Sequence, residues 1–159
     1  VSGLIDAFIE LKKEKQIEHS LVLVGGKGWL YKSIMQQIKN HPEVIYCGYG
    51  YDRFKYLKKA DLLIQPSFYE GFGMSLLDAF AAGVPVACSN ISSLPEVAGD
   101  AAIYFDPKNK QEMKSAIYAG ITDRALHDSL KEKGTERLKN FTWKKCAEQT
   151  LLVLKGKHV

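Results

Sequence analysis

The stretch that decides the fold runs from Pro66 to Phe80 and reads PSFYEGFGMSLLDAF. It follows an apolar run, residues 61–65, which is short enough to be a buried parallel strand. The proline ends that strand because it has no N–H to donate to a ladder. Gly71 and Gly73 let the backbone bend and let a ligand come close. From Met74 on, apolar side chains recur at helical spacing, so the stretch predicts a strand, a glycine turn and a helix.

Such a turn brings the free N–H groups of a helix N-terminus to the carboxyl end of a strand. Unpaired donors and a partial positive charge make this position an anion site. Two carboxylates, Glu70 and Asp78, flank it, and carboxylates accept hydrogen bonds from sugar hydroxyls. The combination predicts a ligand that carries both phosphate and sugar. Many doubly wound domains contain the same unit without binding anything there, so the spacing alone leaves a structural turn as an alternative.

The run from Glu70 to Ala79, EGFGMSLLDA, resembles the E-G-F-G-x-x-x-x-E-A signature of the retaining glycosyltransferases of family 4. The resemblance continues in order through residues 82–87, 89–90, 94–97 and 106–107 and covers nearly the whole chain. Members of this family are GT-B enzymes that use nucleotide-diphosphate sugars, and this chain is similar to their C-terminal, donor-binding half. It departs from the signature at Asp78, where the family usually has Glu.

The resemblance implies a role for each residue of the turn. Glu70 would be the catalytic residue, binding sugar hydroxyls close to the reacting carbon. Asp78 would accept the ribose hydroxyls, through a weaker or water-bridged contact because Asp is one methylene shorter than Glu. The donor sugar and the diphosphate would be approached by the backbone of Gly71, Phe72, Gly73, Met74 and Ser75.

The implied reaction is transfer of a sugar from a nucleotide-diphosphate sugar to an acceptor hydroxyl, in polysaccharide, glycolipid or lipopolysaccharide synthesis. Catalysis would depend mainly on positioning and on stabilising the leaving group. No metal cluster is visible in the sequence, and no cofactor besides the donor substrate is expected. Two alternatives stay open: a nucleotide-binding module without catalytic activity, and a flavodoxin-like or receiver-like regulatory domain. A receiver would need a phosphorylatable Asp after its third strand, where this chain has residues 65–67, QPS.

Length and composition favour one soluble globular domain. The chain has 159 residues, of which 46% are hydrophobic and 25% charged. Its net charge of +4 is mild and its charges are interspersed, which argues against a nucleic-acid partner. No apolar run reaches membrane-spanning length and no signal peptide opens the chain, so we expect a cytoplasmic protein. Peripheral association with the inner face of the membrane, through a full-length enzyme, stays open. We expect reduced, buried thiols at Cys47, Cys88 and Cys146.

Predicted strands alternate with helices along the chain. Strands are predicted at 20–24, 44–47, 61–65, 84–88 and 101–105, and helices at 1–16, 29–40, 51–59, from 74 to about 82, 109–121, 123–139 and 143–155. The alternation predicts an α/β fold with a Rossmann-like doubly wound parallel sheet, helices on both faces and further helices at the C-terminus. Ser93 and Glu96 have capping-box spacing around Pro95. This fold would be one half of a GT-B enzyme.

Two further loops follow predicted strands. Residues 25–28, GGKG, lack the third glycine of a dinucleotide fingerprint, which would fall at Tyr31, and they lack the P-loop pattern. This loop is either a tight turn or part of the donor-cleft rim, with Lys27 as a phosphate neighbour. The resemblance places the nucleotide base near Gly48 and Tyr49, although an ordinary half-exposed loop aromatic explains Tyr49 as well.

In the family, a strand and a turn with an Arg/Lys pair precede the first helix, and these residues are absent here. We therefore expect residues 1–159 to be a single nucleotide-sugar-binding domain, excised from or part of a larger two-domain enzyme whose N-terminal acceptor-binding domain is missing. The last helix has an apolar stripe formed by Trp143, Cys146, Ala147, Thr150, Leu151 and Leu154. Leu152 and Val153 lie off the stripe, and a missing partner surface would explain them.

Overall fold

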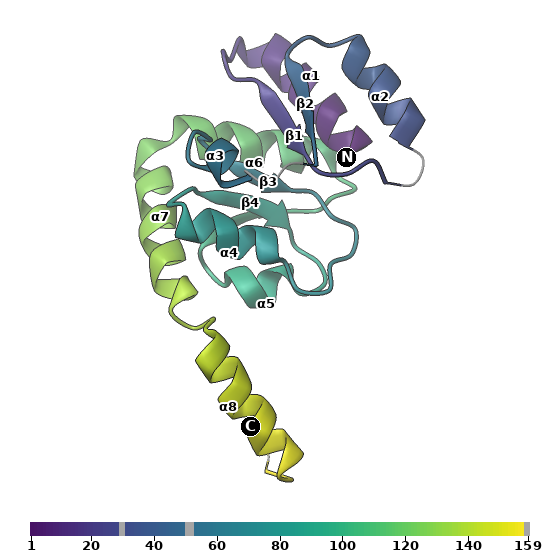
Figure 1. The fold of residues 1–159 in the computed structure, drawn as a ribbon. Helices are drawn as coiled ribbons and strands as arrows, with labels where there is room; N and C mark the ends of the chain where they lie inside the picture. The colour runs from purple at the N-terminus through teal and green to yellow at the C-terminus, as the bar shows by residue number, and fades with distance from the viewer. Residues whose placement is uncertain (29–30, 50–52, 158–159) are drawn as a thin grey trace.

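The structure is a computed structural model that describes residues 1–28, 31–49 and 53–157 (Figure 1). The predicted starts of two helices, near Trp29 and Tyr51, lie outside these residues. The other predicted boundaries fall within two residues of the observed ones. In chain order the elements are α1 (Ser2–Lys15), β1 (Leu21–Val24), α2 (Tyr31–Lys39), β2 (Val44–Gly48), α3 (Arg53–Leu57), β3 (Leu63–Gln65), α4 (Met74–Ala81), β4 (Val86–Ser89), α5 (Leu94–Ala98), β5 (Ala102–Phe105), α6 (Lys110–Thr122), α7 (Arg124–Leu138) and α8 (Trp143–Leu154).

All strand pairs are parallel, which confirms the Rossmann-like α/β fold. The strands form two groups, β1–β2 and β3–β4–β5. Within the described residues no ladder joins β1 to β3, so the single sheet expected from the sequence is divided at this point. A cavity of about 1110 Å³ lies between the two strands, with residues 21–24 on one side and 62–65 on the other.

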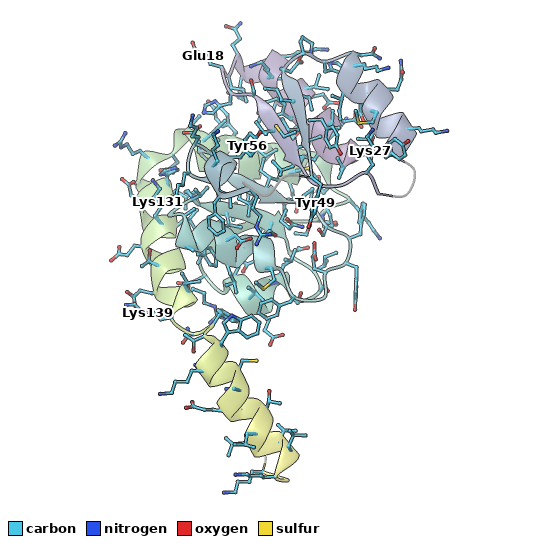
Figure 2. The ribbon with its side chains drawn as sticks, viewed as in Figure 1. Glu18, Lys27, Tyr49, Tyr56, Lys131 and Lys139 are labelled. Carbon is cyan, nitrogen blue, oxygen red and sulfur yellow. The ribbon has the colours of Figure 1, made fainter. Side chains whose placement is uncertain are left out.

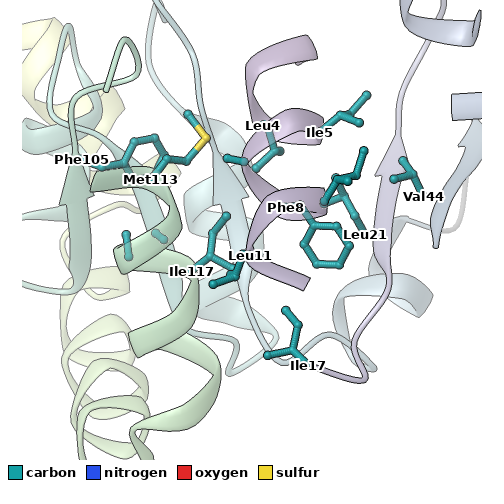
Figure 3. Packing of buried hydrophobic residues seen from close by; sticks show 14 residues of the cluster. Leu4, Ile5, Phe8, Leu11, Ile17, Leu21, Val44, Phe105, Met113 and Ile117 are labelled. Atoms are coloured by element: carbon teal, nitrogen blue, oxygen red, sulfur yellow. The ribbon is translucent and has the colours of Figure 1, made fainter. Parts of the chain in front are cut away.

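Helices cover both faces of the sheets. On β4, Ala87 belongs to one hydrophobic cluster, and its neighbours Val86 and Cys88 belong to the other, as the two-residue period of a strand requires. The first cluster joins α1 and α6 to both sheets, so α1 bridges the divided strands from one side (Figure 3). The second cluster packs α4 and α5 against the opposite face, with Leu76, Phe80, Leu94 and Val97 buried.

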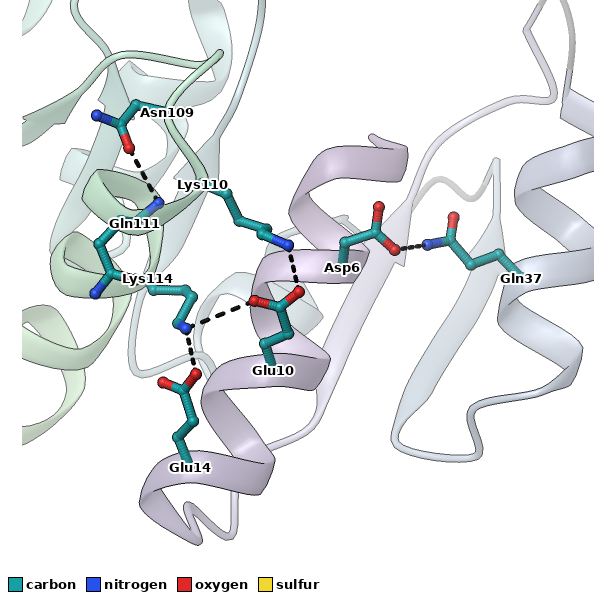
Figure 4. Close-up of polar contacts among 8 residues, drawn as sticks. All are labelled: Asp6, Glu10, Glu14, Gln37, Asn109, Lys110, Gln111 and Lys114. Atoms are coloured by element: carbon teal, nitrogen blue, oxygen red, sulfur yellow. Dashed lines mark hydrogen bonds and ion pairs between the residues drawn. The ribbon is translucent and has the colours of Figure 1, made fainter.

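Polar contacts tie α1 to its neighbours (Figure 4). Lys114 of α6 is only 5% exposed and its Nζ lies 2.5 Å from Glu14 Oε1 and 3.6 Å from Glu10 Oε2. The hydrogen bond to Glu14 and the charges of both carboxylates raise the pKa of Lys114 above its usual value. On the other side of α1, Gln37 Nε2 donates to Asp6 Oδ1 over 2.6 Å. These contacts fix α1 between α6 and α2.

The last helix, α8, projects away from the rest of the chain (Figure 1). None of its residues is buried, and Trp143, Val153 and Leu154 are among the most exposed apolar side chains of the molecule. The apolar stripe predicted from the sequence is therefore present on the helix, but none of its described residues is buried.

The three cysteines are free thiols, as expected, but they are not all buried. Cys88 is buried on β4, and burial raises the pKa of its thiol to about 12. Cys47 is half-buried and Cys146 is exposed on α8. The expectation of buried thiols is thus wrong for Cys146, because α8 has no partner to cover it.

Candidate functional site

The predicted strand, glycine turn and helix are all present around residues 63–81. β3 ends at Gln65, and α4 starts at Met74 with Gly73 as its N-cap residue. Gly73 has φ +106°, and a Cβ added there would lie 2.9 Å from Leu94 Cδ2. Only glycine fits that position. At Gly71 an added Cβ would meet nothing within 4 Å, so this glycine leaves open space beside the turn.

The carboxylate of Glu70 is held by two side chains from the end of β3. Gln65 Nε2 donates to Glu70 Oε1 over 2.6 Å, and Ser67 Oγ donates to the same oxygen over 2.8 Å. Gln65 Nε2 also donates to Ser67 Oγ over 2.8 Å, and Ser75 Oγ donates to Gln65 Oε1 over 3.0 Å. These four side chains form one network that joins the strand, the glycine turn and the first turn of α4.

The main chain of Glu70 is held by the loop that follows β4. Ser92 Oγ donates to Glu70 O over 2.5 Å and accepts from Glu70 N at 3.3 Å, while Ser93 Oγ donates to the same carbonyl over 3.0 Å. The capping box predicted for Ser93 and Glu96 is therefore wrong. Ser93 has helical backbone angles and makes no side-chain cap, because its hydroxyl is used by Glu70 instead.

Asp78 lies in the second turn of α4 and pairs with a cation from α3. Its Oδ2 lies 2.8 Å from Arg53 Nε, and the side chain of Asp78 is 14% exposed against 59% for Arg53. Both residues line the cavity between β1 and β3, together with Lys27 and Ser75. Glu70 and the residues from Gly71 to Met74 are not among the residues that line this cavity. The structure thus places Asp78 at the wall of the cavity, whereas Glu70 meets the cavity only through Gln65 and Ser67, which line it.

The loops after β1 and β2 lie side by side. Gly25 N donates to Gly48 O over 2.9 Å, and a Cβ added at Gly26 would lie 3.9 Å from Tyr49 Cδ2. Figure 2 shows Lys27 and Tyr49 where these two strands end. Tyr49 is 86% exposed, and Lys27 Nζ lies 5.4 Å from the centre of the Tyr31 ring. Gly48 and Tyr49 lie beside the loop that carries Lys27, but unlike Lys27 and Asp78 they do not line the cavity.

Exposed apolar side chains surround the glycine turn. Phe68, Tyr69 and Met74 are more than half exposed. Phe72 makes an edge-to-face contact with Phe141, with ring centres 5.8 Å apart, and this contact joins the turn to the segment before α8. Within the described residues, no group of three or more His, Cys, Asp or Glu side chains is placed to hold a metal ion. Among the described helices, none has the length and apolar character needed to span a bilayer.

Sequence reasoning missed three residues that contact the predicted carboxylates, namely Gln65, Ser67 and Arg53. Gln65 is a polar residue at the end of an apolar strand. Ligands bind at the carboxyl edge of a parallel sheet, so this position could have marked Gln65 as a site residue. Arg53 carried no comparable signal, because a lone arginine at the start of a short helix is common on protein surfaces.

The comparisons with known proteins agree with this fold. The family model of the glycosyl transferases group 1 matches residues 1–137. An O-antigen chain mannosyltransferase B from Escherichia coli is 35% identical over 156 residues, which cover 95% of this chain and 41% of that protein. A mannosylfructose-phosphate synthase from Agrobacterium fabrum is 26% identical over 168 residues, which cover 97% of this chain and 37% of that protein. The chain thus spans about two fifths of the length of these curated relatives.

Solved structures share the fold. The Anabaena protein HepE, crystallised with UDP, superposes with a TM-score of 0.83 at 21% identity, covering 98% of this chain and 44% of its own. The glycosyltransferase WaaG, which is involved in lipopolysaccharide biosynthesis, superposes with a TM-score of 0.77 at 19% identity, covering 98% of this chain and 43% of its own. At these identities the likeness establishes the architecture of the chain alone, which is a Rossmann-like α/β fold.

Proposed function

Because the chain belongs to the glycosyl transferases group 1 family, we propose that it is the donor-binding domain of a retaining glycosyltransferase and binds a nucleotide-diphosphate sugar. The observation that carries this proposal is the Glu70 carboxylate, which two hydrogen bonds hold beside the glycine turn at the N-terminus of α4. A fixed carboxylate next to free helix N–H groups suits a ligand with sugar hydroxyls and phosphate.

In the proposed complex, each predicted site residue has a separate task. Glu70 binds hydroxyls of the donor sugar, and the backbone from Gly71 to Ser75, with Phe72 and Met74 in the turn, approaches the sugar and the diphosphate. Asp78 accepts the ribose hydroxyls, and the loops with Lys27, Gly48 and Tyr49 lie toward the base. The open space at Gly71 supports a close approach of the ligand. The contact of Arg53 Nε with Asp78 Oδ2 supports a carboxylate that is held in place for the ribose.

The proposed reaction transfers one sugar. The bond between the anomeric carbon and the diphosphate oxygen breaks, and an acceptor oxygen forms a new bond to the same carbon. The acceptor proton leaves with the nucleoside diphosphate, which departs as the second product. In this scheme the chain contributes orientation and stabilisation of the leaving diphosphate, with no metal or cofactor besides the donor. The mannosyl-transferring relatives favour a mannosyl donor and a polysaccharide acceptor such as an O-antigen chain.

The acceptor would bind to a second, N-terminal domain of a longer protein. Two observations support this part of the proposal. The chain spans 41% of the length of the Escherichia coli mannosyltransferase. The cavity between β1 and β3 is bounded by two strand edges that pair with nothing in the described chain, and a further parallel strand would join them. We propose that residues preceding Val1 in the longer protein supply this strand.

The test of the proposed function is Glu70→Gln in the longer, two-domain enzyme, with Glu132→Gln on the exposed face of α7 as the matched control. A hydrogen bond to a charged group contributes about 1.5–3 kcal/mol, so we expect sugar transfer to fall by about ten-fold or more. The control should transfer sugar at the wild-type rate. Unchanged transfer in Glu70→Gln, with unchanged circular dichroism, would remove the proposed role. Nucleotide binding without transfer in the wild-type enzyme would favour the binding-module alternative.

A further inference from the structure

We propose that Gln65 is a positioning residue that orients the Glu70 carboxylate toward the donor sugar. This inference rests on the role of Glu70 under the proposed function. Both described hydrogen bonds to that carboxylate reach the same oxygen, Oε1, from Gln65 Nε2 and from Ser67 Oγ. Among the described residues no hydrogen bond reaches Oε2, which leaves this oxygen for a sugar hydroxyl.

The orientation of the Gln65 amide follows from the chemistry of its neighbours. An ionised carboxylate can only accept hydrogen bonds, so the amide must turn its NH₂ group toward Glu70. Its carbonyl oxygen then faces Ser75, whose hydroxyl donates over 3.0 Å. The second amide hydrogen is donated to Ser67 Oγ. The Ser67 hydroxyl in turn donates a hydrogen bond to Glu70 Oε1. The opposite orientation of the amide would place two acceptors against each other at 2.6 Å.

Gln65 belongs to regular structure, whereas the residue that it holds does not. It is the last residue of β3 and pairs with Cys88 of β4, and Ser89 Oγ donates to its main-chain carbonyl over 3.2 Å. Glu70 lies in the turn outside regular structure, between β3 and α4. A side chain on a rigid strand therefore fixes a side chain on a loop, which is the arrangement that a preorganised site needs.

The inference predicts a specific effect of Gln65→Met, which keeps the length of the side chain but removes both amide groups. The measured quantity is the sugar increment, defined as the dissociation constant of the nucleotide divided by that of the nucleotide sugar. It is measured by calorimetry on the 159-residue chain with UDP and UDP-glucose and with GDP and GDP-mannose. The pair with the larger increment in the wild-type chain serves as the probe. This ratio isolates contacts to the sugar.

In Gln65→Met we expect the sugar increment to fall by about five-fold or more, because a charge-assisted hydrogen bond is lost. The affinity for the nucleotide alone should stay within about two-fold of the wild-type value. Glu70→Gln should lower the increment at least as much. In the double variant the loss should equal that of Glu70→Gln alone, since Gln65 acts through Glu70. Gln65→Glu, which keeps the size of the side chain but cannot donate when ionised, should behave like Gln65→Met and carries the test if Gln65→Met does not fold.

Three outcomes overturn parts of the account, and they can be told apart. If Glu70→Gln lowers the increment and neither Gln65 variant does, Gln65 does not position Glu70. If the losses multiply in the double variant, Gln65 acts independently of Glu70 and the inference is also wrong. If Glu70→Gln leaves the increment unchanged, the proposed role of Glu70 fails, and the inference fails with it.

Discussion

Asp78 Oδ2 lies 2.8 Å from Arg53 Nε, so the carboxylate proposed to bind the donor ribose is already paired with a cation from α3. The side chain of Arg53 is 59% exposed and that of Asp78 only 14%. The same pair lines the cavity between β1 and β3. Asp78 is one methylene shorter than the Glu that the family signature carries here. The arginine contact holds the shorter side chain in one orientation.

We therefore expect Arg53→Gln to weaken nucleotide binding by about three-fold to ten-fold, because Asp78 loses the partner that orients it. Because the side chain of Asp78 is only 14% exposed, the loss of its partner should also lower the melting temperature modestly. Calorimetry with UDP and GDP, together with a thermal scan, measures both quantities. The matched control is Arg124→Gln at the exposed start of α7, which should bind like the wild type. An unchanged dissociation constant in Arg53→Gln would show that the pair has no part in binding.

The two glycines of the turn should respond differently to alanine. Gly73→Ala places a Cβ 2.9 Å from Leu94 Cδ2 at φ +106°, so we expect it to destabilise the fold by roughly 1–3 kcal/mol. Gly71→Ala meets no atom within 4 Å, so its free energy of unfolding should stay near the wild-type value while nucleotide-sugar affinity falls. Urea denaturation and calorimetry separate the two effects. Equal stability losses in both variants would contradict the assigned geometry.

The contacts between α1 and α6 make stability depend on pH. The hydrogen bond from Lys110, with the charge of Lys114, lowers the pKa of Glu10 below its ordinary value of 4.5. The stabilisation from Glu10 is therefore complete above the ordinary pKa and is lost as the pH falls through the lowered one. For Lys114 the pKa is raised above 10.5, so its stabilisation is complete below that value and is lost as the pH rises through the raised one.

Glu10→Gln tests the acid limb of this dependence. Its deficit in unfolding free energy relative to the wild type should be largest near neutral pH and should shrink as the pH falls toward about 3, through the lowered pKa of the wild-type carboxyl. Urea denaturation at both pH values measures this difference. Glu132→Gln on α7, for which no partner is described, should show no such trend. A deficit that stays constant with pH would mean that Glu10 stabilises the fold without its charge.

Much of the fold could be predicted from local pattern. The apolar runs at β1 to β5 and the helical spacing after Met74 depend only on near neighbours in the chain, and the predicted boundaries hold within two residues. The role of Gly73 as a turn residue also followed from its position between a strand and a helix. The features of the fold and the site that could not be predicted depend on contacts between segments that are distant in the chain.

Three particular residues show this limit. Ser93 has capping-box spacing, but its hydroxyl bonds Glu70, which is 23 residues away. Arg53 reaches Asp78 only because α3 packs beside α4. Gln65 meets Ser75 and Glu70 only after the glycine turn has folded. Local pattern also could not reveal that β1 does not pair with β3. Strand pairing depends on which strand edges lie side by side in the folded chain, and these strands are far apart in sequence.

Hydrogen exchange tests the proposed strand between β1 and β3. Leu21 N donates to Glu43 O and Leu63 N to Pro85 O, so the alternation of a parallel ladder turns the N–H groups of Val22 and Ile64 toward the cavity. We expect the amides of Val22 and Ile64 to exchange fast in the 159-residue chain and slowly in the longer protein. The Leu21 and Leu63 amides should be protected in both. Equally fast exchange of Val22 and Ile64 in the longer protein would contradict an added strand.

The most direct test of the central claim maps the bound nucleotide on the 159-residue chain. Amide chemical shifts are recorded by two-dimensional NMR while UDP or GDP is added. The account predicts that the largest shifts fall on residues 70–78, with smaller shifts at Lys27 and Tyr49, since the ligand lies over the N-terminus of α4. Shifts clustered elsewhere, for instance on residues 131–139 of α7 and the segment after it, would contradict it.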